Sequence, residues 1–142
     1  MGRILAIDYG SKRTGIAVSD PLQLIASPLE TVATAQLMDF LTNYLSTEQV
    51  DEIIVGLPKK LDNTETSTTP LVKGFVKSLR KKYPHIPVYE MDERLTSIIA
   101  MQSMIAAGSK KKDRKEKAGN LDKVSAALIL QSYMEQKKNT AL

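Results

Sequence analysis

Short apolar runs separated by turn residues dominate the first third of the chain and predict β-strands. Residues 4–10 form an apolar run that ends in glycine, which is typical of a strand buried on both faces. Residues 14–19 predict a second strand, because the connection 10–13 is short enough for a hairpin. Residues 22–32 predict a third strand with an interruption near Pro28. Proline tolerates only edge positions in a sheet, so this strand is expected at the sheet edge.

The rest of the chain alternates helical and strand patterns. Residues 34–48 carry apolar side chains at helical spacing, and Thr34 is expected to cap that helix. Residues 52–56 and 87–91 predict buried strands, and the polar residues 59–69 predict a loop. Between the loop and the fifth strand, apolar residues at i, i+3, i+4 and i+7 predict a helix with Pro70 in or near its first turn.

Two further helices are expected after the fifth strand. The first begins at Thr96 and is closed by Gly108, and the second begins at Asn120 and covers residues 121–136. The element order is therefore β-β-β-α-β-α-β-α plus a terminal helix. Hairpins followed by right-handed crossovers predict an α/β fold, a mixed five-stranded sheet with helices on both faces. A length of 142 residues fits a single domain, 1–142.

Composition excludes several kinds of chemistry. The chain has no cysteine, which rules out disulfides, thiolate nucleophiles and thiolate zinc sites. The one histidine, His85, lies in a Pro-rich turn, with no sign of a serine nucleophile beside it. No stretch is apolar for long enough to span a bilayer, and the N-terminus enters a strand without a visible signal peptide. A cytoplasmic protein that does not bind membranes is expected.

The positive charge is concentrated in one segment. The formal net charge is +4, and residues 110–117 hold six basic and two acidic residues, while the remaining chain is balanced at 14 of each. Such a run is often a solvated loop. Its position just before a candidate carboxylate also favours contact with a phosphate backbone.

Carboxylates are expected at one edge of the sheet. Asp8 ends the first strand, Asp92 and Glu93 follow the fifth, and Asp122 lies in the first turn of the predicted terminal helix. Parallel strands place their carboxyl ends at one edge, where open sheets bind ligands. Asp8 could instead accept hydrogen bonds from the following turn. Asp122 could be a helix-dipole residue, although it shares a face with Ala126, which favours an inward position.

Converging carboxylates repel one another unless a cation neutralises them. Hard divalent ions such as Mg²⁺ take oxygen ligands, and paired ions can clamp the attacking and leaving oxygens of a phosphodiester. Acidic ligands beside a basic segment therefore predict metal-assisted hydrolysis of phosphodiester bonds.

Four segments resemble the motifs of the YqgF/RuvX family, in the family's order and over nearly the whole chain. They are residues 6–17 (AIDYGSKRTGIA), 53–58 (IIVGLP), 92–97 (DERLTS) and 122–131 (DKVSAALILQ). The resemblance implies a ribonuclease H-like fold and a bacterial cytoplasmic nuclease that uses Mg²⁺ or Mn²⁺. The family is assigned to maturation of the 5′ end of precursor 16S ribosomal RNA, and was first proposed to resolve Holliday junctions.

Carried over by motif, the catalytic and metal-binding acids are Asp8, Glu93 and Asp122. Asp92 could share the second role, but strand alternation puts it on the side opposite to Glu93. Relatives of this fold often carry the second acid after the fourth strand, where this chain has Gly56. The phosphate-binding residues are expected to be Lys12, Arg13, Arg94, Lys110, Lys111, Lys112, Arg114 and Lys115.

Two alternatives remain open. The segment 8–11 with Gly15 also resembles the first phosphate loop of actin-like and sugar-kinase ATPases, which need two such domains. The second alternative is a nucleic-acid-binding module whose catalytic site is degenerate. The expected partner is structured RNA or branched DNA, read through backbone and shape because aromatic residues make up only 5% of the chain. A monomer or weak dimer is expected, since no exposed apolar stripe marks a strong interface.

Overall fold

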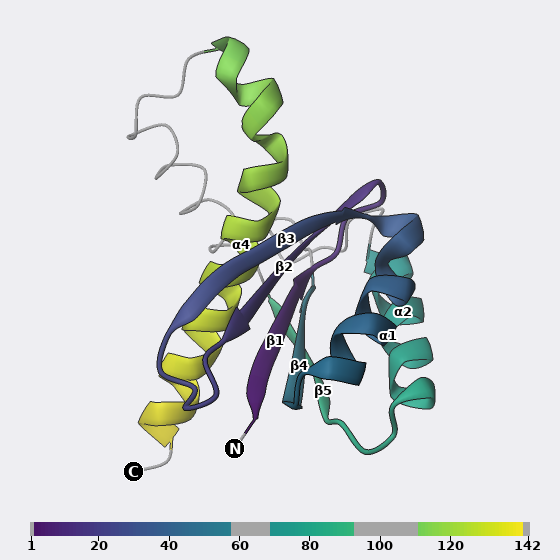
Figure 1. The fold of residues 1–142 in the computed structure, drawn as a ribbon, viewed down its shortest axis with the longest axis vertical. Coiled ribbons are helices and arrows are strands. Elements are labelled where there is room, and N and C mark those ends of the chain that lie inside the picture. The colour runs from purple at the N-terminus through teal and green to yellow at the C-terminus, as the bar shows by residue number, and fades with distance from the viewer. Residues whose placement is uncertain (1, 58–68, 93–110, 141–142) are drawn as a thin grey trace.

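A mixed five-stranded sheet forms the centre of the structure, a computed structural model that describes residues 2–57, 69–92 and 111–140 (Figure 1). Within these ranges, the side chains of residues 92, 111–122 and 138–140 are not described. The strands are β1 (Arg3–Asp8), β2 (Arg13–Ser19), β3 (Ala26–Ala33), β4 (Val50–Leu57) and β5 (Val88–Asp92). The helices are η1 (Thr34–Gln36), α1 (Leu37–Thr47), α2 (Thr69–Lys82) and α4 (Lys111–Thr140).

The strand order is β3-β2-β1-β4-β5, which confirms the predicted sheet and the edge position of β3. Strands β1, β2 and β3 pair antiparallel, whereas β1, β4 and β5 run parallel. The expected interruption of β3 is also present, because the register against β2 shifts next to Pro28. The carboxyl ends of β1, β4 and β5 consequently lie at one edge of the sheet.

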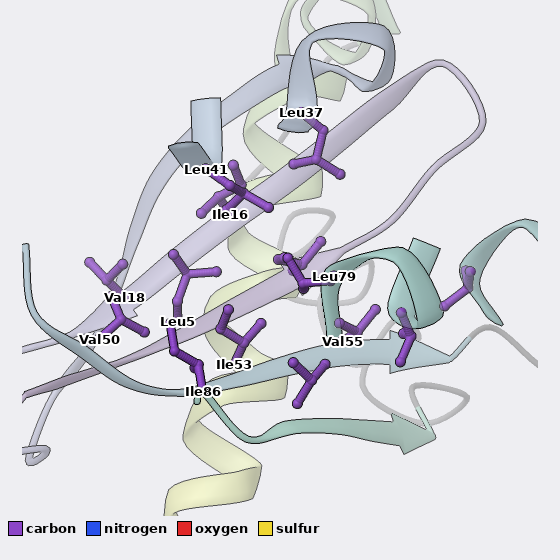
Figure 2. Packing of buried hydrophobic residues seen from close by; sticks show 14 of the residues in the cluster. Leu5, Ile16, Val18, Leu37, Leu41, Val50, Ile53, Val55, Leu79 and Ile86 are labelled. Atoms are coloured by element: carbon purple, nitrogen blue, oxygen red, sulfur yellow. The ribbon is translucent and has the colours of Figure 1, made fainter. Parts of the chain in front are cut away.

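Side chains alternate along β1, so the strand contributes to two separate cores. Leu5 and Ile7 face α1 and α2, while Ile4 and Ala6 face α4 on the other side (Figure 1). Figure 2 shows the first core, where Leu41 of α1 lies beside Ile16 of β2. The helix predicted from spacing over residues 70–82 is confirmed as α2, which buries Val72, Val76 and Leu79.

Helix α4 packs on the sheet through a stripe of small and branched residues. Ala126, Ala127, Ile129 and Leu130 are buried against Ile4, Ala6, Ala17 and Ile54. The two alanines let the helix axis come close to β1. Each fully buried Ile or Leu contributes about 1.5–3 kcal/mol relative to an exposed position.

The third strand begins at Ala26 instead of Leu22. The Asp20 carboxylate accepts hydrogen bonds from the backbone amides of Leu22 (3.2 Å), Leu24 (2.7 Å) and Ile25 (2.7 Å). These amides are therefore committed to a turn and cannot join the ladder. The three apolar side chains, which suggested a strand, are exposed instead.

Two predicted helix caps are wrong. No capping side-chain hydrogen bond opens η1 or α1, and the hydroxyl of Thr34 donates to the carbonyl of Gly10 at 2.6 Å instead. Asn120 lies within α4, which begins at Lys111. The basic segment expected as a loop is thus helical from Lys111 onward, because lysine, arginine, glutamate and alanine are all strong helix formers.

Two other predictions fall outside the described residues. These are the helix from Thr96 to Gly108 and the loop 59–69, apart from Thr69, which opens α2. Pro70 follows in the first turn of α2, as expected. In the described ranges, every helix is too short or too polar to cross a membrane.

Candidate functional site

Asp8 is the last residue of β1 and lies half-buried at the carboxyl end of the parallel strands. It pairs with Gly15 of β2, and its neighbour Ile7 pairs with Val55 of β4. Alternation along β1 puts Asp8 on the face of Ile4 and Ala6, which is the face covered by α4. The backbone of Asp8 is therefore held by its pair with β2, and the preceding residue is held by β4.

A hollow of about 580 Å³ opens beside the turn that follows Asp8. Among the described residues it is lined by Gly10, Ser11, Lys12 and Arg13. The side chains of Lys12 and Arg13 are exposed there, so the wall of the hollow is basic. A side chain on Gly10 would run into the carbonyl oxygen of Arg13, which explains why glycine occupies this tight turn.

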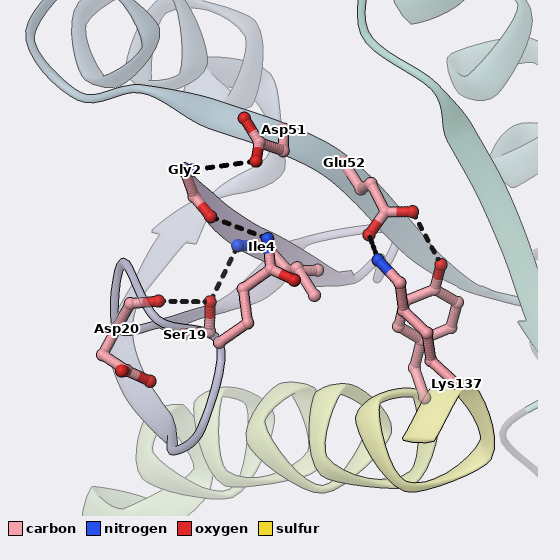
Figure 3. A network of polar contacts seen from close by, with 9 residues as sticks. Gly2, Ile4, Ser19, Asp20, Asp51, Glu52 and Lys137 are labelled. Atoms are coloured by element: carbon pink, nitrogen blue, oxygen red, sulfur yellow. Dashed lines mark hydrogen bonds and ion pairs between the residues drawn. The ribbon is translucent and has the colours of Figure 1, made fainter. Parts of the chain in front are cut away.

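Helix α4 is attached to β4 through Glu52, which Figure 3 shows at the C-terminal half of the helix. The hydroxyl of Tyr133 donates to Oε1 of Glu52 at 2.9 Å, and Lys137 Nζ lies 2.6 Å from Oε2. Partial burial, reinforced by the hydrogen bond to Glu52, raises the pKa of Tyr133. Glu52 in turn pairs with Ile4 at the start of β1. These contacts set the register of α4 along the sheet.

That register bears on the position of Asp122. Helix α4 runs opposite to β1 (Figure 1). Position 122 lies about 16 Å up the helix axis from Tyr133, at a rise of about 1.5 Å per residue. Asp8 lies about 13 Å along β1 from Ile4, at about 3.3 Å per residue. From these two rises we expect the backbone of Asp122 near the level of Asp8, one helical turn before the buried Ala126.

The remaining predicted site residues are only partly covered by the described ranges. Glu93, Arg94 and Lys110 lie outside them. Lys111, Lys112, Arg114 and Lys115 occupy the first two turns of α4, and Asp122 follows further along, but none of these side chains is described. Within the described side chains, no three acidic or histidine residues gather as a metal site would require. The three-acid site stays a prediction.

The donor chemistry at this edge of the sheet fits a hard cation. The chain has no cysteine, and His85 lies at the opposite edge, in a pocket with Glu48, Val50 and Asp51 before β4 and β5. Oxygen ligands are what remains near Asp8, and Mg²⁺ and Mn²⁺ prefer them. His85 is in the turn that the sequence predicted.

Two threonines contact the turn that lines the hollow; the sequence did not single out Thr14 and predicted Thr34 only as a helix cap. Thr14 is fully buried, and its hydroxyl lies 2.9 Å from the hydroxyl of Thr34. A signal was present: Thr14 continues the alternation of Ile16 and Val18, so a polar group occupies an apolar position. Threonine is also a common strand residue, which conceals that signal.

The chain has a ribonuclease H-like fold. It resembles the Fowlpox virus resolvase in its complex with Holliday junction DNA, with a TM-score of 0.58 and 14% identity over 94% of this chain and 97% of that chain. It also resembles RuvC of Thermus thermophilus, with a TM-score of 0.54 and 15% identity over 97% of each chain. At these identities the likeness concerns the fold alone.

The chain belongs to the RuvX family. The family model, described as "Holliday junction resolvase", matches residues 2–136. A relative from Bacteroides fragilis is 53% identical over 97% of this chain and 99% of its own length, and one from Phocaeicola vulgatus is 55% identical over the same shares. Both relatives carry the name "Putative pre-16S rRNA nuclease".

Proposed function

We propose that this protein is a metal-dependent nuclease that processes the 5′ end of the precursor of 16S ribosomal RNA. It is a hydrolase of phosphodiester bonds, in keeping with its family and its ribonuclease H-like fold. The observation that carries the proposal is the position of Asp8 at the carboxyl end of the parallel strands, two residues before the basic turn that lines the hollow. The names of relatives about 50% identical over nearly the whole chain favour the ribosomal substrate.

Asp8, Glu93 and Asp122 would hold Mg²⁺ or Mn²⁺. The level of position 122 on α4 supports the pairing of Asp8 with Asp122. On β5, Val88 packs on the face of α1 and α2, while Met91 packs on the face of α4. If the alternation continued past Asp92, the next position would return to the face of Asp8. This alternation favours Glu93 over Asp92 as the second ligand.

The cation would lower the pKa of a bound water and stabilise charge on the phosphate oxygens. The protein's own residues bind and orient the substrate. Lys12 and Arg13 would contact phosphates at the hollow, and Arg94 would extend that contact. The basic residues at the start of α4 and just before it, Lys110, Lys111, Lys112, Arg114 and Lys115, would hold the strand further from the cut by backbone electrostatics.

The setting of this activity is the bacterial cytoplasm, where ribosomal precursors are matured. A single cut at one RNA end needs one active site, so a monomer or weak dimer suffices. Resolution of a junction needs two paired cuts, which calls for a two-fold dimer. Structured RNA read by shape and backbone is the partner that the composition favours.

The test compares the wild-type chain with Asp8→Asn on a labelled precursor RNA that carries the 5′ extension. Cleavage should require Mg²⁺ or Mn²⁺ and should be abolished in Asp8→Asn. Asp51→Asn is the matched control, because Asp51 lies at the opposite edge of the sheet and bonds the backbone of Gly2 at 2.8 Å (Figure 3). Undiminished cleavage by a folded Asp8→Asn variant would contradict the proposal.

Holliday junction resolution is the second candidate, favoured by the description of the family model. A labelled four-way DNA junction in the same assay separates the two. Paired symmetric cuts in the junction, with the RNA left intact, would assign the DNA substrate. If the protein binds the RNA and the junction but cuts neither in the presence of metal, it is a non-catalytic binding module.

A further inference from the structure

We infer that Thr14 and Thr34 are positioning residues, which hold the turn of residues 10–13 in the shape that binds a phosphate group of the nucleic acid. This inference rests on the proposed function, because it concerns how the nuclease holds its substrate. Neither threonine reaches the hollow itself; the residues that line it there are Gly10, Ser11, Lys12 and Arg13.

The two threonines and Gly10 form a closed ring of hydrogen bonds. The amide of Gly10 donates to the hydroxyl of Thr14 at 3.5 Å, and the hydroxyl of Thr34 donates to the carbonyl of Gly10 at 2.6 Å. Because Thr34 has only one hydroxyl proton, Thr14 must be the donor in the 2.9 Å contact between the two hydroxyls. Each group in the ring thus both donates and accepts, an arrangement in which the bonds strengthen one another.

A second contact extends the ring across the turn. The backbone amide of Thr34 donates to the carbonyl of Lys12 at 2.9 Å. Thr34 therefore binds the turn at two points, Gly10 and Lys12. Thr14 is fully buried, so no water can replace its hydroxyl without rearrangement of the core. The ring joins three segments, namely the end of β1, the start of β2 and the start of η1.

Asp8 also has an anchor outside the ring. Its backbone is held by the ladder pair with Gly15, whereas the residues after it lie beyond the last pair of β1. Loss of the ring should consequently loosen the turn that carries Lys12, while Asp8 and Arg13 keep their ladder pairs with Gly15 and Ala33. The kinetic signature of such a device is a higher KM with an unchanged kcat, because substrate binding is weakened without loss of the reacting groups.

The experiment uses Thr14→Val and Thr34→Val, which remove the hydroxyl at nearly constant volume, with Thr14→Ser and Thr34→Ser as rescue variants. Thr47→Val is the matched control, since Thr47 is exposed at the far end of α1. Cleavage of the labelled precursor RNA gives KM and kcat, and amide hydrogen exchange reports on Gly10. We expect the valine variants to raise KM about fivefold to tenfold, as the loss of roughly one hydrogen bond would.

The serine variants should restore KM, and the Gly10 amide should exchange faster only in the valine variants. In a Lys12→Gln/Arg13→Gln background, Thr14→Val should have little further effect on KM, because the threonine acts through the turn. A folded Thr14→Val with wild-type KM, or one in which kcat alone falls, overturns the inference and leaves the nuclease assignment intact. A wild-type protein that neither binds nor cuts nucleic acid overturns the proposed function, and this inference with it.

Discussion

The hydroxyl of Tyr133 in α4 donates a hydrogen bond of 2.9 Å to the carboxylate of Glu52 in β4. The two residues come from opposite halves of the chain, and Lys137 binds the other oxygen of the same carboxylate at 2.6 Å. The ring of Tyr133 also stacks on Tyr89 of β5, with centroids 6.1 Å apart. Glu52 is thus the point at which the terminal helix is tied to the sheet.

Tyr133→Phe should lower the free energy of unfolding by about 1 kcal/mol, because the variant leaves a carboxylate oxygen without its donor. Tyr89→Phe is the control, since it preserves the stacked ring but removes a hydroxyl from an exposed side chain. Urea denaturation at pH 7 measures both variants. Equal stability of Tyr133→Phe and wild type would mean that the contact with Glu52 contributes nothing.

The same bond predicts a dependence on alkaline pH. Burial and the hydrogen bond to Glu52 raise the pKa of Tyr133 above its ordinary value of 10.0. Stabilisation by the protonated hydroxyl is therefore complete below pH 10 and is lost as the pH rises through the higher folded-state value. The stability difference between wild type and Tyr133→Phe should shrink above pH 10, and a difference that grows would refute this linkage.

Substitution of the acids distinguishes Asp92 from Glu93. Glu93→Gln and Asp122→Asn should each lower kcat at least about 100-fold, because a bound cation supplies several kcal/mol of transition-state stabilisation. Asp92→Asn should stay within about threefold of wild type, if the alternation of β5 puts it on the opposite face. Cleavage rates at saturating Mg²⁺ distinguish the two residues. A large loss of kcat in Asp92→Asn but not in Glu93→Gln would make Asp92 the ligand.

Salt dependence tests the basic start of α4. Lys111→Gln with Lys115→Gln should reduce the slope of log affinity against log salt by about 1.5, since each phosphate contact contributes about 0.7 to 0.9. Lys77→Gln with Lys81→Gln is the control pair, because these two lysines have the same spacing along the sequence and are both exposed on α2. Binding titrations of labelled RNA at several salt concentrations, from low to moderate, give the slope for each double variant. If the two double variants show equal salt slopes, the start of α4 does not belong to the binding surface.

The Asp20 turn predicts a dependence on acidic pH. Hydrogen bonds from the backbone, first that of Ile25, lower the pKa of Asp20 below its ordinary value of 3.8. The stabilisation by the ionised carboxylate is present above pH 3.8 and is lost as the pH falls through the lower folded-state value. Asp20→Ala should therefore lower the denaturation midpoint at pH 7, and its difference from wild type should shrink as the pH falls below 3.8. A difference that grows toward acidic pH would point to another cause.

Local patterns predicted the strands well and the caps poorly. Alternating apolar residues in β1 and the edge-restricting Pro28 depend on neighbours in the sequence, so they could be read directly. The Thr34 cap failed because its hydroxyl has partners outside the helix: it donates to the carbonyl of Gly10 and accepts from the hydroxyl of Thr14. The start of α4 failed because a charged run indicates contact with solvent but does not distinguish a loop from an exposed helix.

The order of the described strands and helices and the two faces of β1 were determined by the sequence alone, because hydrophobic spacing and turn residues act over a few positions. The candidate acids were named from the sequence and its family motifs, and they stay a prediction. Only the tertiary structure decided the register of α4 against β1 and the hydrogen-bonded ring of Gly10, Thr14 and Thr34. Both depend on contacts between residues distant in the chain, which exist only after the two cores have formed.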